Sequence, residues 1–221
     1  MLDRKTRYLQ IAFNDDLGLV YRVLPTLPRN DRILIEAGTP FIKREGLKGI
    51  SAIRTFWSGG IVADLKTADG AIDEVQMAYS AGATAATVLG SAPPETLDLF
   101  VAACKQRGID SMIDMLGVED PLRMLREMKM PPEVVILHKG RDEESTRGKA
   151  IKYKHVNRIR SKYNVLISAA GGVDLKEARS AIFNGANIVV VNIVSSADPW
   201  TGIRDADNIA AIAQKFLDTI E

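Results

Sequence analysis

Eight short apolar runs recur along the chain, and each is followed by a longer stretch in which apolar residues return at helical spacing. The runs are rich in Val, Ile and Leu and lack the strict alternation of a strand that is buried on one face only. Such continuous runs are typical of strands covered on both faces, as in a parallel sheet. The predicted strands are Tyr8–Phe13, Arg32–Ala37, Ile61–Leu65, Ala85–Leu89, Asp110–Met115, Val134–His138, Val165–Ala169 and Ile188–Val191.

Helices are predicted between the strands, and several of them are followed by a glycine. Gly82, Gly108 and Gly185 stand just beyond helical stretches, where a residue in the left-handed conformation commonly ends a helix. A polar loop is expected after the sixth strand. The predicted helices are Leu17–Leu24, Lys43–Phe56, Ala71–Ala81, Pro93–Arg107, Pro121–Met128, Lys149–Lys162, Asp174–Asn184 and Arg204–Ile220.

The regular order of strand and helix predicts the architecture. Repeated strand–helix units indicate a parallel sheet that is either closed into a barrel or doubly wound. Eight such units in 221 residues favour an α/β fold of the (β/α)8 TIM barrel type. No shift in composition marks a linker, so a single domain is expected over residues 1–221.

Composition and charge exclude several classes of protein. The 29 basic and 28 acidic side chains nearly cancel, which gives no general attraction to nucleic acid or to membrane surfaces. The lone cysteine, Cys104, excludes an intrachain disulfide and lies in an apolar helical pattern typical of a buried residue. The chain has no signal-peptide core and no run of 18 uncharged apolar residues, so a cytoplasmic location is expected.

Three charged residues stand at the end of the third predicted strand. Asp64 and Lys66 are two residues apart, so on a strand they point to the same side, and Asp69 follows shortly after. A charge at the mouth of a buried strand needs a partner or a ligand, because an unpaired buried charge costs several kcal/mol. A solvated ion pair between Asp64 and Lys66 is the alternative to a catalytic role.

Polar residues also end the other strands, where the active sites of barrels are found. Glu36, Asp64 and Asp114 would supply the hard oxygen ligands that magnesium prefers, although Glu36 can also be expected to pair with Lys66. His138 is either a proton carrier or a structural histidine with satisfied hydrogen bonds. The polar strand-end residues are Asn14, Glu36, Asp64, Lys66, Asp114, His138, Gly171, Gly172 and Asn192.

The glycine pair after the seventh strand and the basic run around His155 support two further predictions. Gly171 and Gly172 precede a helix late in the barrel, where backbone N–H groups commonly bind phosphate. His155 stands among Lys152, Lys154 and Arg158, which favours a solvated helix face for that run.

Several motifs together resemble those of 3-hexulose-6-phosphate synthases. These enzymes belong to the orotidine 5′-monophosphate decarboxylase superfamily, together with 3-keto-L-gulonate-6-phosphate decarboxylases, and the resemblance covers nearly the whole chain. The motifs, in the order expected, are Leu9-Gln10-Ile11-Ala12, Ile35-Glu36-Ala37-Gly38-Thr39-Pro40, Ala63–Asp69, Thr87-Val88-Leu89-Gly90, the stretch from Ile113 to Pro121, and Ala170-Gly171-Gly172.

The resemblance implies a magnesium-dependent aldol reaction between ribulose 5-phosphate and formaldehyde. Glu36 and Asp64 would lie near the metal, Lys66 would stabilise an enediolate, and His138 would carry the proton. Asp69 would reach into the partner's site, which implies a homodimer with shared active sites. Arg141 stands where the keto-gulonate decarboxylases use an arginine, so decarboxylation of a β-keto sugar phosphate is the alternative reaction.

The chain departs from the family's pattern at three places. The first strand ends in Asn14 rather than aspartate, the eighth in Asn192-Ile193 rather than Gly-Gly or Gly-Arg, and Trp200 follows that strand. The last departure predicts an aromatic ring that packs on the barrel rim or touches the ligand. These changes favour a third alternative, a related reaction on a substrate with a different phosphate contact. A barrel that binds a metabolite or a partner without turnover is the fourth.

Overall fold

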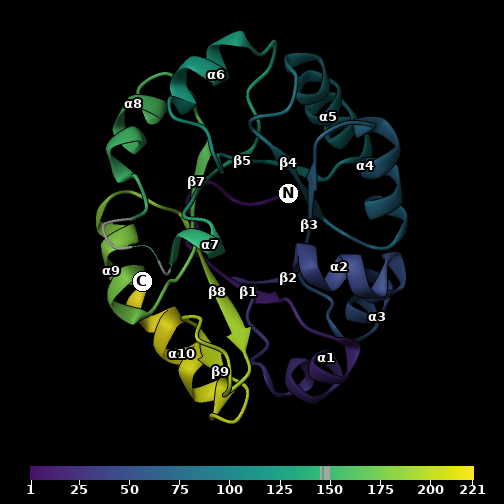
Figure 1. Cartoon of the computed structure of the whole chain (residues 1–221), viewed down its shortest axis with the longest axis vertical. Helices are drawn as coiled ribbons and strands as arrows, with labels where there is room; N and C mark the ends of the chain where they lie inside the picture. The colour runs from purple at the N-terminus through teal and green to yellow at the C-terminus, as the bar shows by residue number, and fades with distance from the viewer. Residues whose placement is uncertain (145, 147–149) are drawn as a thin grey trace.

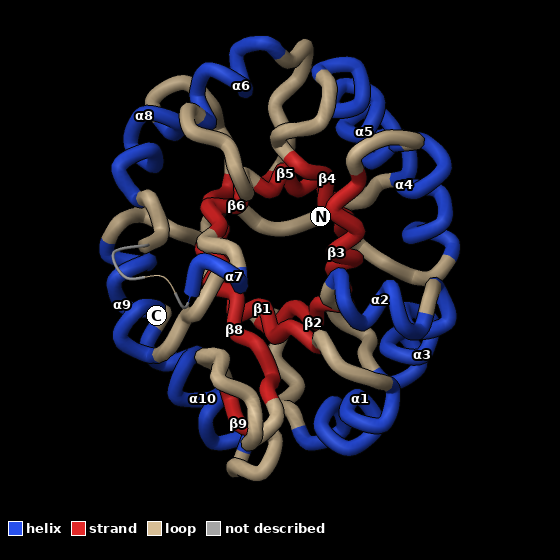
Figure 2. Tube along the Cα trace, in the orientation of Figure 1, coloured by secondary structure: helices blue, strands red, loops and turns tan. Residues whose placement is uncertain are grey.

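The computed structural model describes residues 1–144, 146 and 150–221, and their strands form a closed barrel. Eight parallel strands follow one another in chain order, and β1 also pairs with β8, which closes the ring (Figure 2). The predicted (β/α)8 TIM barrel is therefore confirmed. The strands are β1 (Tyr8–Phe13), β2 (Ile33–Ala37), β3 (Ile61–Thr67), β4 (Ala85–Leu89), β5 (Asp110–Asp114), β6 (Val134–His138), β7 (Leu166–Ala170), β8 (Ile188–Val194) and β9 (Ile203–Arg204).

Helices surround this ring of strands and cover its outer face (Figures 1 and 2). None of the helices within the described residues is long and apolar enough to cross a membrane. The α-helices are α1 (Leu17–Val23), α2 (Thr39–Glu45), α3 (Leu47–Phe56), α4 (Ala71–Ser80), α5 (Pro94–Arg107), α6 (Pro121–Glu127), α7 (Arg141–Glu144), α8 (Val156–Arg160), α9 (Leu175–Phe183) and α10 (Ile209–Thr219), with 3-10 turns η1 (Leu24–Thr26) and η2 (Tyr153–His155).

Two helix predictions were wrong because a local break interrupts the pattern. The helix predicted over Lys43–Phe56 is divided into α2 and α3 at Gly46, whose φ of 64° lies in the left-handed region. The helix predicted over Arg204–Ile220 begins only at Ile209. The residues before it form β9, which pairs with the end of β8 outside the ring.

The region after β6 also differs from expectation. The loop predicted there contains the short helix α7, which lies over one side of the barrel opening in Figure 2. The helix predicted over Lys149–Lys162 is reduced to η2 and α8, and its predicted start at Lys149 lies outside the described residues.

His155 does not lie on a solvated face. Its side chain is buried, and neither ring nitrogen has a hydrogen-bond partner within the described part of the chain. The lysines and arginines around it led to the prediction of a solvated face, although one position per helical turn of such a run can face inward. Cys104 is fully buried, as predicted, and burial raises the pKa of its thiol.

The apolar core has two layers, one between strands and helices and one inside the barrel. The inner layer includes Tyr8, Leu34 and Met112 from alternate strand positions. Leu2 packs against this layer, and its backbone N–H donates to Asp110 Oδ2 at 2.9 Å. The N-terminal segment thus covers the amino end of the barrel, and the polar strand ends lie at the other end.

Candidate active site

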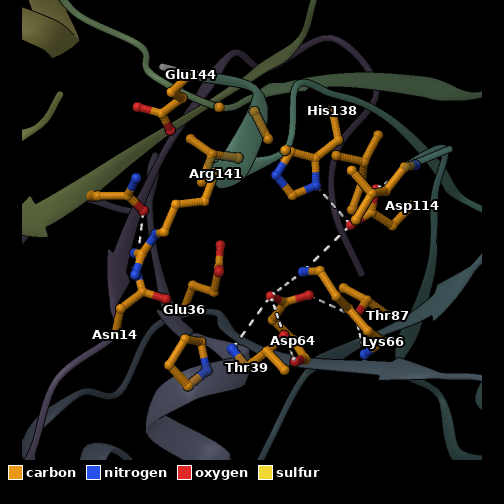
Figure 3. A pocket seen from close by; sticks show the side chains of 18 of the residues that line it. Asn14, Glu36, Thr39, Asp64, Lys66, Thr87, Asp114, His138, Arg141 and Glu144 are labelled. Carbon is orange, nitrogen blue, oxygen red and sulfur yellow. Dashed lines mark hydrogen bonds and ion pairs between the residues drawn. The ribbon is translucent and has the colours of Figure 1, made fainter. Parts of the chain in front are cut away.

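A pocket of about 370 Å³ lies at the carboxyl ends of the barrel strands (Figure 3). Every barrel strand contributes a lining residue, so the polar strand ends lie around one pocket, as predicted. The predicted site residues that line it are Asn14, Glu36, Asp64, Lys66, Asp114, His138, Arg141, Gly171 and Asn192.

Four side chains form a continuous chain of charges across the pocket. Lys66 Nζ lies 2.5 Å from Asp64 Oδ2 and 3.4 Å from Asp114 Oδ2. Asp114 Oδ2 lies 2.8 Å from His138 Nδ1 (dashed in Figure 3). Asp64 and Asp114 are both buried. The arrangement is therefore an enclosed network of acids and bases, and the alternative of a solvated ion pair is wrong.

Two threonines that the sequence reasoning missed hold Asp64 in place. Thr39 Oγ1 donates to Asp64 Oδ2 at 2.8 Å, and Thr87 Oγ1 donates to Asp64 Oδ1 at 2.9 Å. Both carboxylate oxygens thus have a hydroxyl partner that fixes the orientation of the group. Thr87 occupies an inward-facing strand position where an apolar residue is the usual choice, and this was the signal available in the sequence.

The backbone at Lys66 departs from the regular strand conformation that side-chain alternation assumes. Its φ of 48° is the only positive value for a described residue other than glycine, and the pairing of β3 with β4 shifts register between Ala63 and Thr67. Lys66 N–H donates to Thr87 Oγ1 at 2.9 Å, which helps to hold this conformation. A left-handed non-glycine residue is held against a local cost of about 1–3 kcal/mol, and such residues concentrate at functional sites.

The charges in this network shift the pKa values of its members. Burial lowers the pKa of His138, but the hydrogen bond and charge of Asp114 outweigh it, so the net pKa lies above the ordinary value. Burial raises the pKa of Asp114, yet the hydrogen bond and charge of His138 and the charge of Lys66 bring it below its usual range. Burial likewise opposes the charge of Lys66, but Asp64 and Asp114 raise its pKa overall. The network therefore favours charged Lys66 and Asp114.

Glu36 lies beside this network without a cation of its own. Lys66 pairs with Asp64 and Asp114, and the expected ion pair between Glu36 and Lys66 is absent among the described residues. Gln10 Nε2 donates to Glu36 Oε2 at 2.5 Å. Burial and the charge of Asp64 raise the pKa of Glu36 to about 7. A buried carboxylate with so little compensation is suited to a cation that arrives with the substrate.

The carboxylates fit magnesium as a pair and not as a group of three. Within the described residues, no three His, Cys, Asp or Glu side chains are grouped so that they could hold a metal ion. The prediction of Asp114 as a third ligand beside Glu36 and Asp64 is therefore corrected, and Asp114 instead accepts hydrogen bonds from His138 and from Leu116 N–H. Glu36 and Asp64 remain, and magnesium commonly binds through one or two carboxylates with water and substrate oxygens completing the octahedron.

Asn14 and Asn192 close one end of the pocket together. Asn14 Nδ2 donates to Asn192 Oδ1 at 3.0 Å, which joins the ends of β1 and β8. Gly38 makes room for this pair, because a Cβ on Gly38 would lie 2.2 Å from Asn14 Oδ1. A neutral amide pair therefore stands at the carboxyl ends of β1 and β8.

The glycine turn after β7 is packed tightly against the segment after β6. Gly171 and Gly172 have φ values of 101° and 64°, and a Cβ on Gly171 would lie 1.9 Å from Lys139 O. Only glycine fits this approach. Gly171 lines the pocket and Gly172 lies just outside its lining. Arg141 extends from α7 into the pocket (Figure 3).

Asp69 lies apart from the network formed by its own chain. It is exposed, follows the end of β3, and does not line the pocket. Its predicted catalytic role would therefore have to be fulfilled in another protomer.

A closed barrel with a buried acid–base network at its carboxyl ends defines a TIM-barrel enzyme. The chain belongs to the orotidine 5′-phosphate decarboxylase / HUMPS family, whose model matches residues 15–205. The predicted family resemblance and the predicted class, a lyase of this group, are confirmed.

Curated relatives include two archaeal proteins named bifunctional enzyme Fae/Hps. The protein from Methanocella arvoryzae is 38% identical over 218 residues, which cover 97% of this chain and 53% of that protein. The protein from Methanocaldococcus jannaschii is 38% identical over 199 residues, which cover 89% of this chain and 50% of that protein. The chain thus spans about half the length of the curated relatives it matches.

Solved structures agree with this assignment. The 3-hexulose-6-phosphate synthase from Salmonella typhimurium superposes with a TM-score of 0.82 at 26% identity, covering 96% of this chain and 98% of that one. Another 3-hexulose-6-phosphate synthase is 30% identical, with a TM-score of 0.75, and covers 97% of this chain and 100% of that one. A keto-gulonate-phosphate decarboxylase from Streptococcus mutans, at 20% identity and TM-score 0.75, shares the fold.

Proposed function

We propose that this chain catalyses the aldol addition of formaldehyde to ribulose 5-phosphate, or the reverse cleavage, as a 3-hexulose-6-phosphate synthase. The observation that carries the proposal is the network of Asp64, Lys66, Asp114 and His138 beside the buried Glu36. A reaction that develops negative charge on neighbouring oxygens needs a fixed cation and a proton carrier in the same enclosed site. The pocket supplies both.

The reaction would begin with loss of a proton from C1 of ribulose 5-phosphate. His138 takes this proton at Nε2, because its Nδ1 is held by Asp114. The electron pair left behind forms a C1–C2 double bond and the carbonyl π electrons move to the C2 oxygen, which gives an enediolate whose negative charge the Lys66 ammonium stabilises. C1 then bonds to the carbon of formaldehyde, and the electrons of the carbonyl π bond move to its oxygen, which recovers a proton from His138.

Magnesium is proposed as the cofactor of this site. Glu36 and Asp64 would hold it, and when bound it would act as a Lewis acid toward the substrate oxygens. The raised pKa of Glu36, which burial and the charge of Asp64 cause, supports a cation at this position.

Decarboxylation of a β-keto sugar phosphate is the second candidate. Arg141 favours it, because this arginine lines the pocket with His138 and stands three residues after it, where the resemblance places an arginine of the keto-gulonate decarboxylases. The amide pair Asn14–Asn192 favours instead a substrate whose phosphate contacts differ from those of the family.

The hypothesis of a barrel that binds a ligand without turnover is disfavoured, because keeping the charges of Asp64, Lys66 and Asp114 buried costs free energy of folding.

Incubation with ribulose 5-phosphate, formaldehyde and magnesium tests the proposal. We expect formaldehyde to disappear at a rate proportional to enzyme concentration. No loss at high enzyme concentration, together with release of CO2 from 3-keto-L-gulonate 6-phosphate, would favour the decarboxylase instead. A cytoplasmic location stays a prediction.

A homodimer with shared active sites is also proposed. Asp69 is exposed outside its own pocket, and the neighbouring helix α4 exposes Ile72, Met77 and Tyr79 by 51%, 42% and 46%. Apolar side chains gathered on one helix are typical of a surface that a partner covers. A second copy placed there would bring Asp69 to the other protomer's site.

Mixing two inactive variants tests this arrangement. Asp69→Ala and Lys66→Ala should each be inactive alone, because each lacks one residue of every site. After exchange of subunits, hybrid dimers contain one intact site, so about a quarter of the wild-type activity should return. Formaldehyde consumption before and after mixing measures it. If both residues belong to the same protomer's site, mixing will restore nothing.

A further inference from the structure

Arg141 is held between the pocket and an aromatic ring. Its guanidinium carbon lies 5.4 Å from the centroid of the Trp200 ring, within the range of a cation–π interaction. Arg141 lines the pocket and extends from α7 over its mouth (Figure 3). Trp200 belongs to the segment between β8 and β9. The segment after β6 and the segment after β8 therefore meet at this contact.

The segment that carries Trp200 is braced by its own hydrogen bonds. Arg204 Nη1 donates to Ser195 O at 2.9 Å and to Asp198 O at 2.7 Å, and Ser195 N–H donates to Asp198 Oδ2 at 3.0 Å. The pairing of Ile193 with Ile203 joins the ends of the segment. Trp200 thus stands on a closed loop, which suits it to fix the position of a neighbouring side chain.

Arg141 is the pocket cation that remains available to a ligand. Lys66 is engaged by Asp64 and Asp114, and His138 is engaged by Asp114. Among residues 1–144, 146 and 150–221, no carboxylate forms an ion pair with Arg141. An anionic group that enters the pocket would therefore meet Arg141 without first breaking a salt bridge.

The same helix places a carboxylate on the glycine turn. A Cβ on Gly172 would lie 3.1 Å from Glu144 Oε2 and 3.1 Å from Lys139 Nζ, so both groups lie over this turn. Arg141 and Glu144 are three residues apart on α7 and share one side of it. Arg141 is thus one helical turn from the residue whose carboxylate lies over the glycine turn.

We infer that Trp200 is a positioning residue that holds Arg141 over the pocket, and that Arg141 so placed binds the substrate's phosphate ester beside Gly171–Gly172. Glu144 lies over that turn and opposes an incoming anion by its like charge. The inference rests on the proposed function for the identity of the substrate. It assigns to α7 and Trp200 the phosphate contact that Asn192-Ile193, with no basic side chain, does not provide.

Fluorescence of Trp200 tests this without any turnover. The chain has two tryptophans, and Trp57 is 2% exposed, so Trp57→Phe leaves Trp200 as the sole reporter. Titration with inorganic phosphate, and separately with ribulose 5-phosphate, should change its emission. Arg141→Met in the same background should weaken phosphate binding at least about tenfold, as expected for loss of a charge-assisted contact. Glu144→Gln should tighten it several-fold.

Steady-state kinetics supplies the second readout. Trp200→Leu should raise KM for ribulose 5-phosphate about five- to tenfold and leave kcat within about twofold, because a positioning ring acts on binding. Trp200→Phe, which keeps an aromatic face, should recover most of the loss. Phe183→Ala, which removes an aromatic side chain that is 89% exposed, should change neither value.

The outcomes separate this inference from the proposed reaction. If phosphate binding follows Arg141 and Trp200 while no formaldehyde is consumed, the inference holds and the proposed reaction fails. If formaldehyde is consumed but Trp200→Leu leaves KM and phosphate binding unchanged, the inference is overturned. A fall in kcat equal to the rise in KM, with Trp200→Phe giving no recovery, also overturns it.

Discussion

Replacing Lys66 with alanine is expected to lower kcat/KM for the aldol addition by at least about 10³-fold, as loss of one preorganised electrostatic group commonly does. The ammonium is the cation placed between Asp64 and Asp114, so its removal leaves the enediolate without that stabilisation. It also leaves the buried Asp64 without its cation and Asp114 with His138 alone, which should lower the free energy of unfolding by about 3–5 kcal/mol. Formaldehyde consumption and urea unfolding measure the two effects.

Lys129→Ala is the matched control for that variant. Lys129 also forms an ion pair with an aspartate, but its Nζ lies 3.8 Å from Asp98 Oδ2 and its side chain is 85% exposed. An exposed pair of this kind contributes about 0–1 kcal/mol, so activity and stability should stay near the wild-type values. If Lys66→Ala behaves like Lys129→Ala, Lys66 is not the cation on which the reaction depends.

Replacing Glu36 with glutamine is expected to abolish activity and, without metal, to stabilise the protein at alkaline pH. The folded protein raises the pKa of Glu36 from 4.5 to about 7, through burial first and the charge of Asp64 second. A carboxyl whose pKa is raised on folding favours the folded state below pH 4.5, and this contribution is lost as pH rises toward 7. At pH 8 the wild type therefore carries a cost of about 2–4 kcal/mol that the variant lacks.

Unfolding by urea at pH 4.5 and pH 8, with a chelator and then with magnesium, tests this prediction. With the chelator present, the variant should have a larger free energy of unfolding than the wild type at pH 8. At pH 4.5 the free energies of unfolding of the two proteins should be nearly equal. Magnesium should raise the stability of the wild type and leave the variant unchanged, because a ligand stabilises only the form that binds it. Glu127→Gln, on an exposed helix face, is the control. Equal stabilisation of both proteins by magnesium would remove Glu36 from the metal site.

The fold could be predicted because both faces of its strands are covered. Continuous apolar runs such as Val134–His138 indicate buried strands directly, because no alternation of apolar and polar residues has to be interpreted. Most of the helices between them were predicted at nearly correct positions. Two of the errors arose where one residue overrides a pattern. Gly46 breaks a helix whose apolar spacing continues across it, and His155 faces inward from a run of basic residues.

The candidate site was predictable in its members but not in its pairings. Strand ends converge in any barrel, so Asp64, Asp114 and His138 could be placed together from the sequence. Their distances depend on the left-handed Lys66, which leaves no periodic signal, and on hydroxyls such as Thr87, whose inward-facing position shows that the residue is polar but not which partner it holds. The contact between Arg141 and Trp200 joins two loops, and nothing in the spacing of two loops indicates that they meet.

Exchange of the C1 hydrogen of ribulose 5-phosphate in heavy water, followed by NMR without formaldehyde, measures whether Lys66, Asp64, Asp114 and His138 form and hold an enediolate. We predict that the wild type with magnesium replaces the C1 hydrogen with deuterium, and that Lys66→Ala and His138→Gln do so at least about 10²-fold more slowly. Exchange that persists in Lys66→Ala, or its absence in the wild type, would show that this network does not form the enediolate.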